Sequence, residues 1–321
     1  MSGGAVPARP VAQDDRPVAL VLRALGLGDL LVAVPALRAL RRAYAAHRVV
    51  LAAPAWLGPV VALTAAVDEL VPVADLGAAL PPVGPVDLAV NLHGAGPQSH
   101  ALLDAFAPRE RIGHTAPGWE GPVWVDETNE RRRWVEVLGH HGVPGDPSDV
   151  GLERPTVPSP APGAVVVHVG AAYGSRSWPA DRFAAVAREL TARGRTVVLT
   201  GSAAERERAT AIGDAAGLPA HANLAGRTGL AELAALVADA ALVVTVDTGA
   251  AHLATAYATP SVVLFGPATV ERWGPPAEGP HVVLTDERVR VGDAFGPTPD
   301  PALLAVGPRD VLRAAEDLLS A

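Results

Sequence analysis

The sequence predicts an α/β protein made of two doubly wound, Rossmann-like lobes that face each other across a cleft. Short aliphatic runs alternate with amphipathic stretches along the 321 residues, a pattern typical of buried parallel strands connected by helices. The alternation stops at a proline-rich segment near the middle of the chain and then starts again. The length also exceeds the roughly 100–200 residues of a usual single domain, so we expect two domains.

The first lobe is expected to span residues 18–143. An aliphatic run at 17–22 is followed by Gly26 and Gly28 and then by leucines and valines at helical spacing, which predicts a strand, a glycine turn and a helix. Further strands are predicted at 48–52, 70–73 and 87–92, and further helices at 56–63, 97–106 and 127–138. Residues 1–17 lack the apolar segment of a secretory signal, so we expect a disordered tail there.

A stiff linker is predicted at residues 144–162, because this stretch is rich in proline and has almost no apolar periodicity. The second lobe then occupies residues 163–308. Its predicted strands are 165–169, 196–199, 242–246 and 261–265, and its predicted helices are 181–193, 204–216, 230–238 and 249–257. A last helix at 309–319, in the final segment 309–321, has no strand after it, and we expect it to cross back onto the first lobe.

The composition excludes several functions. The net charge is −8 and the only basic run is Arg131–Arg133, whereas nucleic-acid binding needs a broad cationic face. The chain has no cysteine, which excludes disulfides and thiolate metal sites and fits a cytoplasmic location. No apolar stretch approaches the roughly 18 residues of a transmembrane span. We therefore expect a cytoplasmic protein with no transmembrane segment and no nucleic-acid partner.

The loop after the predicted strand 242–246 is the richest in chemistry. It reads Asp247-Thr-Gly-Ala-Ala-His252 and opens a helix. A helix start offers free N–H groups and the positive end of the helix dipole, and Gly249 lets a phosphate approach the backbone. Thr248 and His252 add side-chain donors. Asp247 and Thr248 alone could be ordinary helix caps, but the combination favours a diphosphate site.

Three further loops of the second lobe end predicted strands or precede helices. Arg176, before the helix 181–193, could supply a forked cation for a diphosphate or could be an ordinary surface arginine. Glu205 could bind ribose hydroxyls or stabilise the first turn of its own helix. Thr228 could line the pocket of a nucleotide base, although the glycines beside it suit any tight connection. These residues are the further candidates for donor binding.

In the first lobe, Asp29 stands at a predicted helix start in the cleft, where a carboxylate could take a proton from a hydroxyl or merely cap the helix. Asn91 and His93 follow the predicted strand 87–92 and are candidate acceptor contacts. Gly26 and Gly28 match the first two glycines of the dinucleotide-binding motif G-x-G-x-x-G. Leu31 stands where the third glycine should be, which makes an NAD-dependent dehydrogenase a poor fit. No histidine pair has the spacing of a zinc site, and there is no Asp-X-Asp pair, so we expect no metal.

Together these motifs resemble glycosyltransferase family 9, the ADP-heptose:lipopolysaccharide heptosyltransferases, which have a GT-B fold. The segment Arg23-Ala-Leu-Gly-Leu-Gly-Asp29 is similar to the family's first strand and loop, which implies that Arg23 contacts the acceptor and Asp29 is the catalytic base. Arg176-Ser-Trp-Pro179 is similar to the family's Lys-X-Trp-Pro, Glu205 matches its ribose-binding glutamate, and residues 247–252 match its Asp-Thr-Gly-X-X-His motif. Arginine replaces lysine at position 176, which keeps the charge and changes its geometry.

The resemblance implies an inverting, metal-independent transfer of a sugar, a heptose from an ADP-activated donor, to a glycan, glycolipid or metabolite hydroxyl. It implies no cofactor beyond the nucleotide-sugar substrate, and it leaves peripheral association with a membrane open. Two alternatives remain at this point. One is a nucleotide-sugar epimerase of the same architecture, and the other is a non-catalytic protein that binds nucleotide sugars.

Overall fold

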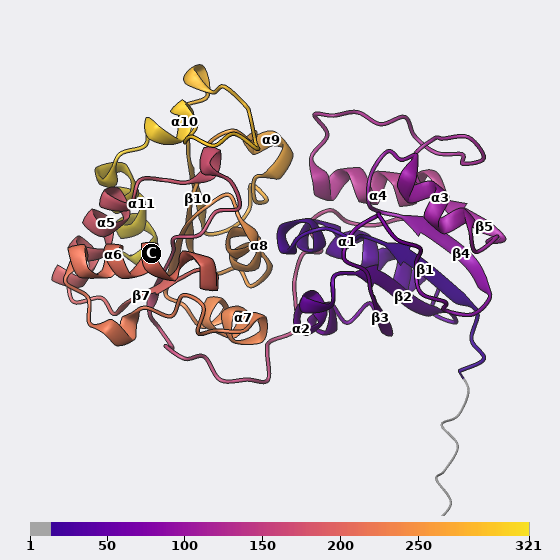
Figure 1. Cartoon of the computed structure of the whole chain (residues 1–321), viewed down its shortest axis with the longest axis horizontal. Helices are drawn as coiled ribbons and strands as arrows, with labels where there is room; N and C mark the ends of the chain where they lie inside the picture. Colours follow the sequence, from indigo (N-terminus) through magenta and orange to yellow (C-terminus); the bar gives the residue numbers. More distant parts are fainter. Residues whose placement is uncertain (1–13, 321) are drawn as a thin grey trace, which may run out of the picture.

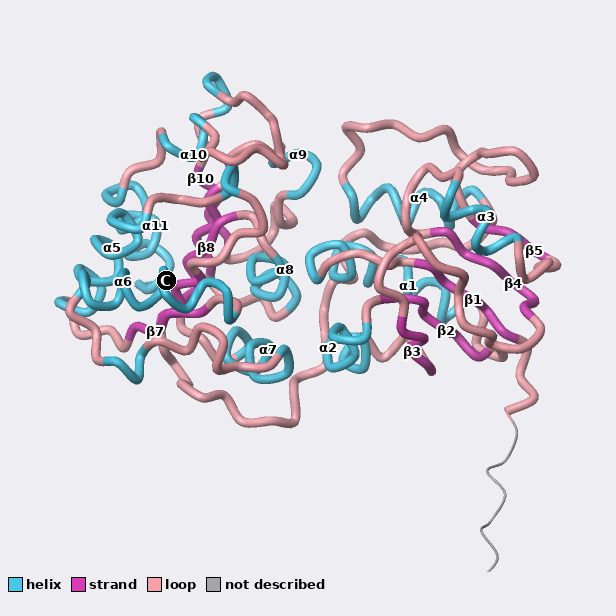
Figure 2. Tube along the Cα trace, viewed as in Figure 1, coloured by secondary structure: helices cyan, strands magenta, loops and turns pink. Residues whose placement is uncertain are grey.

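The computed structural model describes residues 14–320 and has two parallel sheets of five strands each (Figure 1 and Figure 2). This confirms the predicted pair of doubly wound α/β lobes. In each lobe, helices cover both faces of the sheet, and the central strands are short aliphatic segments whose side chains are almost all buried. In such a sheet, ligands bind at the loops that follow the carboxyl ends of the strands.

The first sheet has the strand order β3-β2-β1-β4-β5. Helices α1, α2 and α4 cover the face toward the second lobe, and α3 lies on the other face. The bounds are β1 Val18–Leu22, α1 Leu27–Ala43, β2 Arg48–Ala53, α2 Gly58–Leu63, β3 Glu69–Pro72, β4 Val86–Asn91, α3 Gln98–Asp104, β5 Glu110–Ile112 and α4 Glu130–His140.

The second sheet has the order β10-β9-β8-β6-β7. Helices α5, α6 and α11 pack on one face, and α7 and α8 lie on the side that meets the first lobe. The bounds are β6 Val165–His168, α5 Ala180–Ala192, β7 Val197–Thr200, α6 Arg206–Ala216, α7 Leu230–Ala238, β8 Leu242–Val246, α8 Gly249–Ala256, β9 Ser261–Leu264, α9 Val270–Trp273, β10 His281–Leu284, α10 Pro301–Leu304 and α11 Pro308–Ser320.

Some expectations need correction. Helix α11 packs against α5 and strands β8, β9 and β10, so the expectation that the last helix crosses back to the first lobe is wrong. Helix α4 starts at Glu130, three residues later than predicted, because Asn129 caps it by accepting a bond from the Arg132 N–H. The edge strands β5 and β10 were not predicted, since they are very short and β10 is only half-buried.

The two segments predicted to lack regular structure are only partly described. Residues 1–13 of the predicted tail lie outside the described residues, whereas Arg16 pairs with Asp68 of the first lobe at 3.2 Å. Segment 144–162 contains neither helix nor strand. It is attached at both ends, because Asp149 pairs with Arg38 at 2.6 Å and Arg154 pairs with Asp239 at 2.7 Å. Among the helices that the structure describes, none is long and apolar enough to cross a membrane.

The lobes meet where α1 packs on α8 and α2 packs on α7, as Figure 1 shows. Their apolar residues merge into one cluster that includes Leu30 and Val34 of α1 and Leu253 of α8. The start of α8 packs so closely on the side chain of Leu27 in α1 that Gly249 has no room for a Cβ atom. A methyl group on Gly249 would lie 2.7 Å from Cδ2 of Leu27 and 2.9 Å from its Cβ.

We expect Gly249→Ala to lower the free energy of unfolding by about 1–3 kcal/mol through overpacking. The loss should shrink in a Leu27→Ala background, because the contacts with Cγ and Cδ2 of Leu27 disappear and only the contact with Cβ remains. Urea denaturation of the four proteins measures both effects. Gly139→Ala in α4 is the matched control, because a methyl group there meets no atom within 4 Å. Equal losses in both backgrounds would show that Leu27 does not lie against Gly249.

Candidate active site

The loop after β8 presents unbonded backbone N–H groups. Thr248 is the N-cap of α8, but its hydroxyl bonds Thr245 Oγ1 at 3.1 Å instead of capping the helix. Among the described residues, no acceptor bonds the N–H groups of Gly249 and Ala250. These groups, together with the positive end of the helix dipole, form a place where an anion would be stabilised.

The start of α1 faces the start of α8 across the lobe boundary. A methyl group on Gly28 would lie 3.0 Å from the ring of His252. Asp29, in the first turn of α1, accepts a bond from the Gly26 N–H at 3.3 Å through Oδ2, and its Oδ1 lies 3.7 Å from the Arg23 guanidinium. Its side chain is 31% exposed. Asp29 thus caps its helix and also offers a carboxylate to the cleft.

Asp247, Arg176 and His252 form a largely buried cluster of ionisable side chains opposite Asp29. Asp247 lies 3.5 Å from Arg176 and 3.9 Å from His252. Burial raises the pKa of Asp247 to about 6, with a further rise from Asp29 and an opposing effect of Arg176. Burial, together with Arg131 and Arg176, lowers the pKa of His252 to about 3. His252 is therefore neutral at pH 7 and offers an N–H donor without adding charge.

Glu205 is tied to its own backbone. Its two carboxylate oxygens accept bonds from the N–H groups of Ala171, at 2.8 Å, and Ser202, at 2.6 Å. Glu205 therefore stabilises the first turn of its own helix, which is one of its two predicted roles. The same carboxylate joins the loop after β6 to the loop after β7. The turn at Gly226 (φ +62°) packs so closely on Ala203 that a methyl group would lie 2.5 Å from its Cα.

The loop at Gly226 also carries Thr228, which is half-buried. The loops that were expected to bind a nucleotide are therefore adjacent. Three of them, after β6, after β7 and before α7, meet through the contacts of Glu205 and Gly226.

Two of the predicted acceptor contacts are buried. Arg23 is 1% exposed and donates to the backbone oxygens of Asp29 and Leu92. Asn91 is fully buried and bonds Ser99 Oγ at 3.0 Å. Both residues hold loops in place in this structure, and their contact with the acceptor stays a prediction. The sequence could not reveal this, because burial of a polar side chain depends on the loops that close over it.

His93 remains a candidate acceptor contact. Its Nδ1 lies 3.2 Å from the Ala24 N–H, from which it accepts a bond, so the ring proton belongs on Nε2. Burial lowers its pKa, the nearby Arg23 charge lowers it further, and Asp29 opposes both effects. His93 is therefore a neutral donor close to Asp29.

The structure also brings in residues that sequence analysis missed. His168 ends β6 and lies 3.0 Å from Thr200 Oγ1 at the end of β7, and its register partner on β8 is Thr245. The sequence does contain a signal for this pair, because His168 and Thr200 are polar residues at the ends of otherwise aliphatic strands. On the other side, the Trp273 ring lies 6.3 Å from the His252 ring. Nothing in the local sequence connects these two residues.

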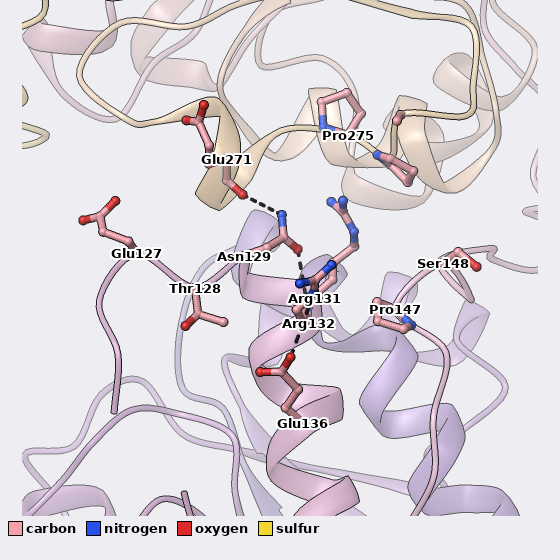
Figure 3. Close-up of a pocket in the computed structure, with 12 residues that line it drawn as sticks. Glu127, Thr128, Asn129, Arg131, Arg132, Glu136, Pro147, Ser148, Glu271 and Pro275 are labelled. Atoms are coloured by element: carbon pink, nitrogen blue, oxygen red, sulfur yellow. Dashed lines mark hydrogen bonds and ion pairs between the residues drawn. The ribbon is translucent and has the colours of Figure 1, made fainter. Parts of the chain in front are cut away.

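An opening lies further along the lobe boundary. It is a pocket of about 650 Å³ between the start of α4 and the segment after α9, and its lining includes Asn129, Arg131, Glu271 and Pro275 (Figure 3). Within residues 14–320, no three His, Asp or Glu side chains gather as a metal site would require.

The two facing α/β lobes, with an anion-attracting helix start opposite a cleft carboxylate, define the GT-B class. Comparisons with known proteins show which family part of the chain resembles. Residues 152–290 match the model of glycosyltransferase family 9 (heptosyltransferase). Over these residues the chain is therefore similar to family 9.

The curated relatives match over part of their length. Lipopolysaccharide heptosyltransferase 1 of Pseudomonas aeruginosa is 37% identical over 174 residues, which cover 52% of this chain and 48% of the relative. The chain therefore spans about half the length of the curated relatives it matches.

Solved structures agree with the fold over nearly the whole chain. The family 9 glycosyl transferase of Veillonella parvula has a TM-score of 0.77 at 21% identity and covers 96% of this chain and 98% of its own. The E. coli ADP-heptose lps heptosyltransferase II has a TM-score of 0.73 at 23% identity and covers 95% and 98%. At these identities the likeness shows the shared fold.

The raised pKa of Asp247 predicts a pH-dependent stability. The folded protein holds the Asp247 proton up to about pH 6 and the unfolded chain only up to its ordinary pKa of 3.8. Keeping the buried carboxylate ionised therefore destabilises the fold increasingly between these values and fully above pH 6.

Relative to Asp247→Asn, the wild-type protein should lose about 2–3 kcal/mol of stability as the pH rises from 4 to 7. Urea denaturation at several pH values measures this difference. Asp214→Asn, at an exposed position of α6, controls for the removal of one carboxylate. Parallel curves for wild type and Asp247→Asn would contradict the prediction.

Proposed function

We propose that the protein is an inverting, metal-independent glycosyltransferase that transfers a sugar from a nucleotide diphosphate donor to an acceptor hydroxyl. The observation that supports this most strongly is the apposition of two helix starts. One presents the unbonded N–H groups of Gly249 and Ala250, and the other presents the carboxylate of Asp29. A leaving diphosphate and a deprotonated hydroxyl need these two environments.

In the proposed reaction, Asp29 takes the proton of the acceptor hydroxyl while that oxygen forms a bond to the anomeric carbon. The bond between the anomeric carbon and the diphosphate oxygen breaks on the opposite face, and its electron pair leaves with the nucleotide. Arg176 and the N–H groups at the start of α8 stabilise the charge that develops on the diphosphate. Closing the lobes brings the reactants together and excludes water.

Asp247 and His252 tune the charge of this site. An ionised aspartate beside a diphosphate would repel it, and Asp247, with a pKa of about 6, is mostly ionised at pH 7. The Arg176 cation beside Asp247 offsets this repulsion. Arg176 pairs with Asp247 and keeps other N–H donors for the phosphate. His252, which is neutral at pH 7, can donate a hydrogen bond to a phosphate oxygen or a sugar hydroxyl.

The donor is proposed to be ADP-heptose, and the acceptor a cell-envelope glycan or glycolipid. The names of the similar proteins support this assignment: one is a lipopolysaccharide heptosyltransferase and another an ADP-heptose lps heptosyltransferase. Glu205 and the loop with Thr228 are the proposed walls of the nucleoside pocket, and His93 the proposed acceptor contact. A cytoplasmic location follows from the use of a nucleotide-sugar donor.

A panel of ADP-, UDP-, GDP- and dTDP-sugars in a thermal-shift assay tests the donor, because a bound ligand raises apparent stability by mass action. We expect the largest shift with the ADP-sugar. Arg176→Ala should weaken its binding about ten- to hundredfold through loss of a charged hydrogen bond, whereas Arg195→Ala, at an exposed position after α5, should not. A preference for UDP or GDP would overturn the donor assignment.

Asp29→Asn should lower kcat about 10²–10⁴-fold, because asparagine cannot accept the proton. It keeps an oxygen that can accept the bond from the Gly26 N–H, so folding and donor binding should be unchanged. Nucleotide release in the presence of acceptor measures the rate, and Asp75→Asn, at an exposed position, is the control. An unchanged rate would falsify the assignment of Asp29. Conversion of the donor without an acceptor would indicate an epimerase instead.

A further inference from the structure

The lobes are also joined away from the facing helix starts, where the beginning of α4 meets α9. The Asn129 side-chain amide donates to the backbone oxygen of Glu271 at 2.9 Å, as drawn in Figure 3. The Arg131 guanidinium donates to the backbone oxygen of Gly274 at 2.8 Å. Together with the ion pair between Glu130 and Arg272, these contacts form what we call the interlobe clasp. Its members are Asn129, Glu130 and Arg131 of the first lobe and Glu271, Arg272 and Gly274 of the second.

Glu130 is the shared centre of the clasp. It is 3% exposed. Its Oε1 accepts bonds from Arg133 of its own lobe at 3.3 Å and from Arg272 of the other lobe at 2.9 Å. A buried carboxylate is stable only when it is paired. Separation of the lobes removes one of its two cations, so the ion pair with Arg272 favours the closed arrangement.

On the first lobe, the surroundings of Glu130 reach Asp29. The Arg133 guanidinium lies 3.8 Å above the ring of Trp124, which packs edge-on against Trp134. The Trp134 ring in turn lies 4.8 Å from the guanidinium carbon of Arg23. Arg23 donates to the backbone oxygen of Asp29 and so fixes the first turn of α1.

On the second lobe, the clasp reaches the donor loop. The Arg272 guanidinium lies 5.6 Å from the ring of Trp273. That ring lies 6.3 Å from the ring of His252 on α8. The same ion pair is therefore connected by direct contacts to both sides of the cleft.

Resting on the proposed function, we infer that Glu130 and Arg272 are positioning residues for the transfer. Their ion pair forms when the lobes close and holds Asp29 and His252 in their facing positions. Neither residue contacts the reacting atoms. Their effect is to select the arrangement in which the base and the diphosphate site oppose each other.

The first test compares Arg272→Gln with Arg132→Gln, a control on α4 whose side chain is 66% exposed. We expect Arg272→Gln to lower kcat about three- to thirtyfold with little change in the KM of the donor, because the donor contacts remain. Arg272→Lys should recover most of the rate, since it keeps a cation near Glu130. Equal kcat values for Arg272→Gln and Arg132→Gln, or no recovery with lysine, would overturn the inference.

The second test does not depend on any activity. Small-angle X-ray scattering of the ligand-free full chain should show a larger radius of gyration for Arg272→Gln and for Glu130→Gln than for Arg132→Gln. Circular dichroism confirms that each variant is folded, and Arg272→Gln remains informative if Glu130→Gln does not fold. Unchanged scattering overturns the clasp even if the transferase is active. Expanded variants, together with a wild-type protein that has no transferase activity, overturn the proposed function alone.

Discussion

The end-to-end contact of α1 and α8 is the constraint on which the rest of the site depends. The first turns of these two helices come this close because each has a glycine where the other has a side chain: Gly28 lies against the ring of His252, and Gly249 lies against the side chain of Leu27. The contact directs the positive ends of two helix dipoles into one cleft. It also brings Asp29 near enough to Asp247 to raise its pKa. The glycines are therefore needed for packing and for charge at the same time.

This geometry explains why so many ionisable groups are buried at the lobe boundary. Charges removed from water must be paired or neutralised, and the chain uses both solutions. Arg23 and Glu130 are paired within networks of hydrogen bonds and ion pairs. Asp247 and His252 instead have pKa values shifted toward their neutral forms. When the lobes separate, water reaches these groups, and the pKa shifts of Asp247 and His252 that burial causes become smaller.

The sequence predicted the fold well because the strands are buried on both faces and therefore stand out as continuous aliphatic runs. Helix α7 and strand β8 have the predicted bounds, whereas the half-buried edge strand β10 lacked any such contrast. The position of a candidate site residue was predictable where a loop directly follows a strand, as at Asp247. It was not predictable where tertiary packing decides the role of a side chain. The burial of Arg23 and Asn91 depends on surrounding loops.

Arginine at position 176 fits the cleft in a way that lysine would not. One guanidinium nitrogen faces Asp247 at 3.5 Å, and the Nε is buried with no acceptor among the described residues. A planar guanidinium can direct separate N–H groups to a carboxylate and to a phosphate at once, whereas an ammonium is a single point charge. Asp247 faces only one nitrogen of the guanidinium, so it takes up little of this capacity. In the proposed reaction, the unused donors of Arg176 are therefore available when the diphosphate leaves.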